Sequence, residues 1–160
     1  MVSIIFQCLY YFLPVYAAKL FSSLDFWEKK HLHRLVKIDG KDLLGAIIIS
    51  IIIFSLQKYL YFKGFQSFAL IDYNGFSILM GVLMGLGVIV GDALRLFYRE
   101  QSHLAKSEYW VPWDQWAYLF GAGIFSLALY VPDITVVVII LLASPLFQFI
   151  GYYVHSKISV

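Results

Sequence analysis

Five long apolar segments cover most of this 160-residue chain and constrain its fold more than any other feature. A helix of roughly 20 apolar residues crosses a hydrocarbon layer about 30 Å thick. Hydrophobic residues make up 61% of the chain and charged residues 14%, more apolar surface than a soluble domain of this size can bury. The sequence therefore predicts an all-α, polytopic membrane protein, a single transmembrane domain over residues 1–160. Its five expected helices cover about residues 2–21, 43–62, 76–97, 115–131 and 134–154.

The distribution of Lys and Arg predicts the orientation of these helices. Only two of the twelve, Lys58 and Lys63, lie near the connection between the second and third helices, on the same side of the membrane as the N-terminus. The other ten fall on the opposite side, near the first connection (about 22–42), near the third (about 98–114) and in the C-terminal tail. Because basic residues stay in the cytoplasm, we expect an external N-terminus, a cytoplasmic C-terminus and a cell-membrane protein with its active face in the cytoplasm.

The third apolar segment carries glycines and one acid. Gly81 and Gly85, and Gly87 and Gly91, have the GxxxG spacing that lets membrane helices pack closely. Asp92 follows directly, and an acid in this setting needs a partner. Arg95 and Arg99 lie on its helical face, which allows two interpretations. Asp92 forms an ion pair with Arg95, or it binds Mg²⁺ while the arginines bind phosphate.

A second acid, Asp114, stands directly before the fourth apolar segment. If the two segments are neighbours, Asp92 and Asp114 converge on one metal, and Mg²⁺ needs only one or two carboxylates beside substrate phosphates. The alternative is that Asp114 caps the fourth helix. Asp114 could bind the metal and cap the helix at the same time.

The first connection offers two further cations, Lys37 and Lys41, on either side of a turn at Gly40. They are candidates for binding phosphate as point charges, or else topology signals that contact lipid headgroups. The only cysteine, Cys8, is interpreted as apolar packing. The sequence has no Walker-type glycine loop, and no nucleophile elbow.

The stretch GDALRLFYREQSHLAKSEYWVPWDQWAYLFGA resembles the signature region of the archaeal CDP-archaeol synthases, membrane CTP-dependent cytidylyltransferases related to the bacterial CDP-diacylglycerol synthases. That pattern runs GDxxKSFxKRR, then a basic loop, then WPxxDQLDFxxGA. LPVYAAK (13–19) is similar to its LPxYxAN, and IDGKDLLG (38–45) to its LGDxKTWRG, with Asp39, Lys41 and Gly45 retained. Residues that match or replace the main pattern conservatively are Gly91, Asp92, Arg95, Phe97, Arg99, Trp110, Pro112, Asp114, Gln115, Gly121 and Ala122.

The resemblance implies a reaction and assigns roles to these residues. CTP and a phosphatidate-like or archaeal diether lipid would give a CDP-lipid and pyrophosphate, with Asp92 and Asp114 on Mg²⁺ as the metal ligands and catalytic residues. The substrate-binding residues would be Lys37, Asp39, Lys41, Arg95, Arg99 and Lys106. Nucleic acid is not an expected partner.

The chain also departs from the family pattern at the expected site. Leu96 replaces a serine, Ala117 replaces the second acid of DQLD, and Leu44 replaces an arginine. Glu100 and Gln101 stand where the pattern has two basic residues. Two alternatives to an active enzyme therefore remain, a diverged relative that binds nucleotide or anionic lipid without turnover, and a small transporter with Asp92 as its ion site.

Overall fold

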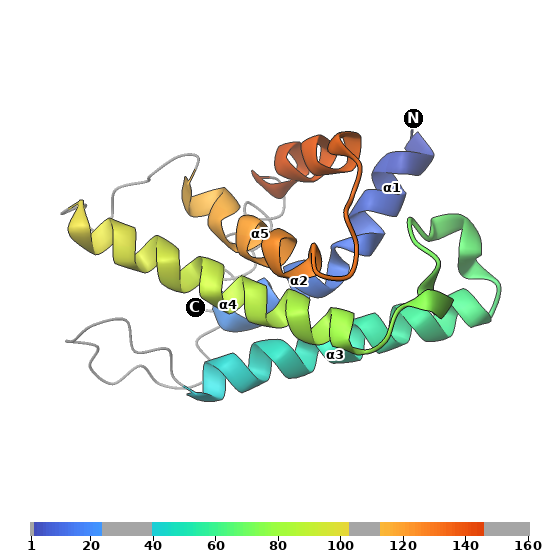
Figure 1. Ribbon diagram of the computed structural model, residues 1–160, viewed down its shortest axis with the longest axis horizontal. Helices are drawn as coiled ribbons and strands as arrows, with labels where there is room; N and C mark the ends of the chain where they lie inside the picture. Colours follow the sequence, from blue (N-terminus) through green and yellow to red (C-terminus); the bar gives the residue numbers. More distant parts are fainter. Residues whose placement is uncertain (1, 24–39, 103–112, 146–160) are drawn as a thin grey trace, which may run out of the picture.

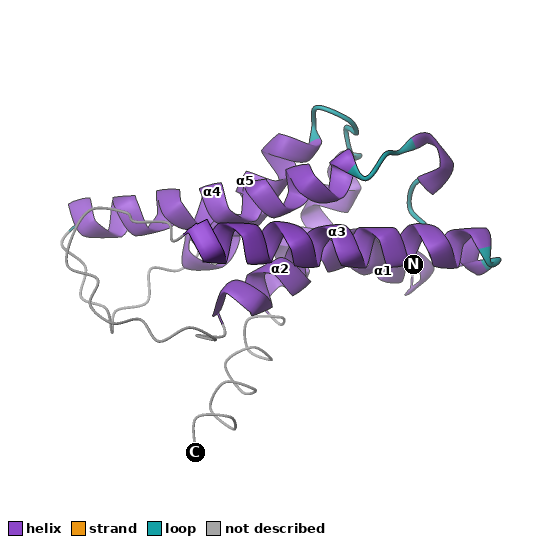
Figure 2. Cartoon of the chain, turned by 90° about the horizontal axis from the view of Figure 1, so that it is seen from below, coloured by secondary structure: helices purple, strands orange, loops and turns teal. Residues whose placement is uncertain are grey.

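The computed structural model describes residues 2–23, 40–102 and 113–145, and every regular element in these ranges is helical (Figures 1 and 2). This result confirms the prediction of an all-α chain. Two short 3-10 helices, η1 (Phe65–Phe68) and η2 (Tyr73–Gly75), lie between α3 and α4, and a further helix covers Ile134–Pro145. The longer helices are α1 (Val2–Tyr11), α2 (Leu13–Ser23), α3 (Gly40–Phe62), α4 (Leu79–Gln101) and α5 (Trp113–Ser126).

Two of the described helices are long and apolar enough to cross a membrane, Leu44–Phe62 in α3 and Leu79–Arg99 in α4. The bent pair α1 and α2 makes a third if it counts as one span. Trp116–Ser126 and Ile134–Pro145 are apolar but shorter. The membrane character of the chain is thus supported, while five spans and their orientation stay predictions.

The structure divides the first predicted helix, residues 2–21, into two helices at Phe12. The two halves, α1 and α2, differ in direction by 48°. The cause is Pro14, which has no N–H to donate to the carbonyl of Tyr10 one turn earlier. Gln57 of α3 donates its side-chain Nε2–H to that carbonyl instead. A backbone acceptor released by proline is therefore satisfied from a neighbouring helix, as apolar surroundings demand.

The two faces of α3 differ in the way expected of a helix in lipid. Ile48, Ile52 and Leu56 lie on its outer face, each about half exposed. Ser50 and Gln57, which are polar, are buried against the other helices. Apolar residues outside and polar ones inside reverse the pattern of a soluble protein and fit a hydrocarbon environment.

The four glycines of α4 pack against two different helices. A Cβ at Gly81 or Gly85 would meet the backbone of α3, 3.1 Å from Cα of Ile51 and 2.8 Å from Cα of Ile47 respectively. At Gly87 and Gly91 it would meet the backbone of α5 instead. Two residues in a helix span about 200°, so the step from Gly85 to Gly87 moves to the opposite face. The paired GxxxG spacings thus place α4 between α3 and α5 (Figure 1).

The connection from α3 to α4 contains four aromatic residues, one of which packs into the bundle. Tyr73 of η2 is buried and its ring contacts those of Tyr10, Phe54 and Tyr61. Burial raises the pKa of the Tyr73 hydroxyl above its ordinary value. The Lys58 ammonium donates to the carbonyl of Phe76 at 2.7 Å. These contacts attach the connection to α1 and α3.

Candidate functional site

Four helix termini meet at the end of the bundle that carries Asp92. α4 ends there and α5 begins there, and their close contact at Gly91 involves Ala117 and Tyr118 of α5. α2 ends beside the beginning of α3, since a Cβ at Gly45 would overlap the ring of Phe21. The termini that flank the first and third connections, the two predicted to be basic and cytoplasmic, thus lie at one end of the molecule.

Asp92 forms an ion pair with Lys19 of α2. The Lys19 Nζ donates to both carboxylate oxygens, at 2.7 Å to Oδ1 and 2.6 Å to Oδ2. The side chains are 15% exposed for Asp92 and 17% for Lys19, so water screens the pair only in part. Asp92 therefore has a strong partner within the bundle.

Arg95 and Tyr118 complete the surroundings of this pair. The Arg95 Nε lies 3.6 Å from Asp92 Oδ1, too far for a hydrogen bond but close enough for charge attraction. The Lys19 ammonium lies 5.5 Å from the centroid of the Tyr118 ring, a cation–π distance. One cluster thus connects α2, α4 and α5 through Lys19, Asp92, Arg95 and Tyr118.

The predicted Asp92–Arg95 pair is therefore present only as the weaker of two contacts, and sequence reasoning missed the stronger one. In the sequence, Lys19 is one of the ten basic residues that predict the orientation of the helices. The available signal was that one apolar segment contains a lone cation and another a lone acid, since ionisable groups within a bundle pair with one another. Tyr118 gave no such signal, because aromatic residues are common throughout the chain.

The remaining predicted site residues fall into three groups. Arg99 lies in the last turn of α4 and is half-buried. Asp114 belongs to the first turn of α5 and Lys41 to the first turn of α3, but their side chains are not among those described. Residues 37, 39 and 106 lie outside the described ranges, so the predictions for Lys37, Asp39 and Lys106 are not tested.

The packing of α4 on α5 sets the level of Asp114 along the bundle. Gly87 contacts α5 at Gly121 and Ala122, and Gly91 contacts it one turn earlier, at Ala117 and Tyr118. The helices are therefore antiparallel, and Asp114, three residues before Ala117, lies at the same end of α4 as Asp92. Convergence of the two carboxylates on one cation stays a prediction, because the Asp114 side chain is not described.

The donor chemistry at this end fits a divalent cation that also binds phosphates. Asp92 is a carboxylate, the ligand type that Mg²⁺ prefers, and one or two carboxylates suffice when phosphates supply further oxygens. Within the described residues there is no group of three or more His, Cys, Asp or Glu side chains. Both Asp92 oxygens contact Lys19, so a cation would share or replace that contact.

Three of the departures from the family pattern can be located in the structure. Leu44 is 60% exposed and Leu96 is 47% exposed, so neither is part of the packed interior. Ala117 differs from both, because its backbone carbonyl lies against Gly91, the residue before Asp92. The missing second acid of the DQLD pattern therefore falls on the face of α5 that packs against α4 beside Asp92.

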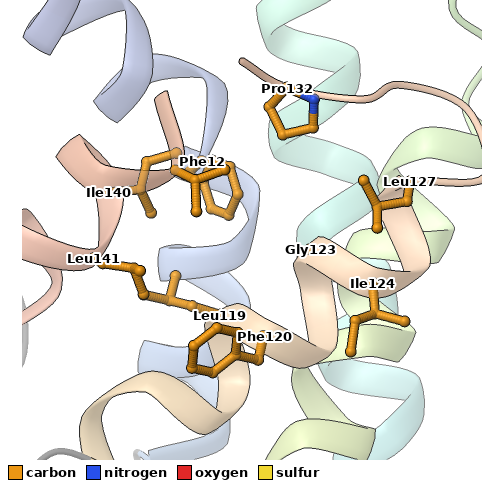
Figure 3. Close-up of a pocket in the computed structure, with 10 residues that line it drawn as sticks. Phe12, Leu119, Phe120, Gly123, Ile124, Leu127, Pro132, Ile140 and Leu141 are labelled. Atoms are coloured by element: carbon orange, nitrogen blue, oxygen red, sulfur yellow. The ribbon is translucent and has the colours of Figure 1, made fainter. Parts of the chain in front are cut away.

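A separate apolar pocket of about 170 Å³ lies beside α5 (Figure 3). Phe12, at the break between α1 and α2, lines it together with Leu119 and Ile124 of α5 and with Ile140 and Leu141 of the following helix. Its walls are almost entirely hydrocarbon, so it offers nothing to a phosphate or a metal. The neighbouring residues Tyr118 and Leu119 belong respectively to the charged cluster and to this pocket.

Comparison with known proteins agrees with the resemblance seen in the motifs. The CarS-like family model, described as CDP-archaeol synthase, matches residues 1–160. A CDP-archaeol synthase from Methanococcus maripaludis is 32% identical over 84 residues, which are 50% of this chain and 47% of that protein. The chain thus aligns with about half the length of this curated relative. No solved structure matches the chain. Because the family match covers the whole sequence, the chain belongs to the CarS-like CDP-archaeol synthase family.

Proposed function

We propose that the chain is a cytidylyltransferase that transfers CMP from CTP to a phosphatidate-like lipid at the cytoplasmic face of the membrane. An oxygen of the lipid phosphate attacks the α-phosphorus of CTP, and the bond between the α- and β-phosphates breaks. The products are a CDP-lipid of the CDP-archaeol or CDP-diacylglycerol type and pyrophosphate. Because the lipid phosphate is already anionic at neutral pH, the reaction needs no strong general base.

The observation that carries this proposal is the position of Asp92. It is a partly exposed acid in the C-terminal half of α4, in contact with Lys19 of α2 and beside the N-terminal half of α5, in a chain of the CDP-archaeol synthase family. Phosphoryl-type transfer depends mainly on positioning and charge neutralisation. An acid with Lys19 and Arg95 beside it would contribute to both.

Each predicted residue has a role in this scheme. Asp92 and Asp114 would hold Mg²⁺, which when bound would neutralise charge on the triphosphate. Arg95 and Arg99, on the face of α4 that carries Asp92, would bind the triphosphate or the departing pyrophosphate. Lys106 would assist them, while Lys41 with Lys37 would meet the lipid phosphate. Asp39 is counted with these substrate-binding residues.

The apolar pocket is suited to the other end of the lipid. Its lining of Phe12, Leu119, Ile124, Ile140 and Leu141 accepts a hydrocarbon chain and rejects polar groups. A lipid with its phosphate near Asp92 and one chain toward Leu119 would lie along α5. The pocket would then recognise the lipid chain by hydrophobic contact alone. Lipids with ether-linked and with ester-linked chains would therefore both be accepted as substrates.

The proposal is tested by assaying the purified chain with CTP, Mg²⁺ and either a diether or a diacyl phosphatidate, and by following pyrophosphate release. We expect release that requires both CTP and the lipid. Absence of turnover with both lipids would contradict the proposal. Replacing CTP by other nucleoside triphosphates in the same assay measures nucleotide preference.

A second candidate is a non-catalytic relative that binds nucleotide or anionic lipid. Two observations favour it, the contact of both Asp92 oxygens with Lys19 and the presence of Ala117 where the family pattern has an acid. In that case CTP with Mg²⁺ would raise the melting temperature without pyrophosphate release. Activity gained by Ala117→Asp would then identify the loss of one metal ligand as the reason.

A further inference from the structure

The ammonium of Lys19 occupies the position from which a cation would approach Asp92. It contacts both oxygens, at 2.7 and 2.6 Å, and both side chains are mostly buried. Arg95 adds a second positive group, its Nε 3.6 Å from Oδ1. The carboxylate is thus already neutralised by groups of the chain itself, from two different helices.

We propose that Lys19 competes with a divalent cation for the Asp92 carboxylate and so sets how tightly the cation binds. This inference rests on the proposed function, in which Asp92 is a metal ligand. Lys19 would be a positioning residue. It keeps Asp92 neutralised and in place until a cation arrives, and it leaves the carboxylate when the cation binds.

Charge repulsion is the physical reason for competition. Mg²⁺ binds carboxylate oxygen at about 2.0 to 2.1 Å, so a cation on Asp92 and an ammonium on the same two oxygens would lie only a few ångströms apart. At a site that water screens poorly, like charges at this separation repel strongly. Arg95 adds to this repulsion. Removing the ammonium takes away the larger part of it, so the cation would then bind more tightly.

Two groups would attract the ammonium after it leaves the carboxylate, the Tyr118 ring and the triphosphate. The ammonium already lies 5.5 Å from the centroid of the Tyr118 ring, whose face attracts cations. A triphosphate bound with the divalent cation would offer anionic oxygens in addition. Exchange of partners, from carboxylate to phosphate, would make metal binding and nucleotide binding reinforce one another.

The test is a calorimetric titration with Mn²⁺ alone, on the full chain purified in detergent and without nucleotide. In Lys19→Met, which keeps the length of the side chain but not its charge, we expect Mn²⁺ affinity to rise at least about tenfold. Adding Asp92→Asn to this variant should abolish the gain. Lys63→Met, which removes an exposed lysine near the other end of α3, controls for the loss of one positive charge.

Lys19→Arg gives an independent reading if Lys19→Met does not fold. A guanidinium holds a carboxylate through two parallel N–H donors, so Mn²⁺ affinity should fall below that of the wild type. Circular dichroism and size-exclusion chromatography establish that each variant is folded before titration.

The possible failures are distinguishable. Equal affinity in the wild type, Lys19→Met and Lys19→Arg, together with weaker binding by Asp92→Asn, would overturn competition by Lys19 and leave Asp92 as a metal ligand. If Asp92→Asn also binds Mn²⁺ like the wild type, both the competition and the metal role of Asp92 in the proposed function are wrong.

Discussion

Lys19 and Asp92 are 73 positions apart in sequence, yet the lysine ammonium donates to both oxygens of the aspartate, at 2.7 and 2.6 Å. The contact joins α2 to α4 at the end of the bundle where α5 begins. Two ionisable groups that would each be costly within apolar helices are thus neutralised together. The pair connects α2 to α4 and occupies both oxygens of the acid.

Removing the Asp92 carboxylate should affect both activity and stability. We expect Asp92→Asn to lower pyrophosphate release at least about 100-fold, because it removes a ligand for the cation that neutralises the triphosphate. It should also destabilise the protein by about 1 to 2 kcal/mol, less than for a fully buried pair, because Lys19 loses its carboxylate partner while remaining partly solvated. Turnover and thermal unfolding in detergent measure the two effects.

Asp114→Asn separates these effects. It should lower turnover to a similar extent, while a change at this position leaves the Lys19–Asp92 pair intact. Full activity in Asp114→Asn together with loss in Asp92→Asn would show that a single carboxylate serves the reaction.

Close packing of α4 on α5 predicts that Gly91 does not tolerate a side chain. A Cβ there would lie 2.8 Å from Cα of Tyr118, and backbone cannot move aside cheaply. We expect Gly91→Ala to lower the free energy of unfolding by about 1 to 3 kcal/mol. The matched control is Gly123→Ala in α5, where a Cβ would meet nothing within 4 Å. That variant should be neutral or slightly stabilising, since alanine favours helix by about 1 kcal/mol over glycine. Equal effects of the two variants on the melting temperature would contradict this account of the packing.

The bond from Gln57 to the Tyr10 carbonyl predicts a double-mutant coupling with Pro14. Gln57→Leu should destabilise the protein by about 1 to 3 kcal/mol, because it leaves a partly buried backbone acceptor without its donor. Pro14→Ala restores an N–H that can bond the same carbonyl by straightening the helix. In the Gln57→Leu background it should therefore recover part of the lost stability. Strictly additive changes in the free energy of unfolding would show that the glutamine does not compensate for the proline.

Cysteine labelling can test the expected orientation of the helices. Cys8 is buried, so its thiol should react little with the label. Gln66 and Ser102 are both exposed, at the end of the bundle near η1 and at the end of α4 respectively. We expect Gln66→Cys to react with a membrane-impermeant maleimide in intact cells. Ser102→Cys should react only after permeabilisation. The reverse pattern would place Asp92 on the external side and contradict a reaction that uses cytoplasmic CTP.

The sequence predicted the parts of this protein that depend on local pattern. The lengths of the apolar segments indicate an all-helical membrane chain, and α3 and α4 are long and apolar enough to span the bilayer. The glycine spacing indicated close helix contacts in α4. The motif around Gly91 and Asp92 identified the family, which the match over residues 1–160 confirms. Each of these features lies within a short stretch, so periodicity and residue type suffice to detect it.

Only the tertiary structure decided which groups meet. The bend at Phe12 is stable because Gln57, from another helix, bonds the carbonyl that Pro14 leaves free. Asp92 has Lys19 as its main partner because the packing of α2 against α4 brings distant residues together. Hydrophobic spacing fixes which face of a helix is apolar, but helix pairing also depends on crossing geometry and on which neighbour satisfies each polar group. The acid of the site could therefore be found in the sequence, whereas its partner required the fold.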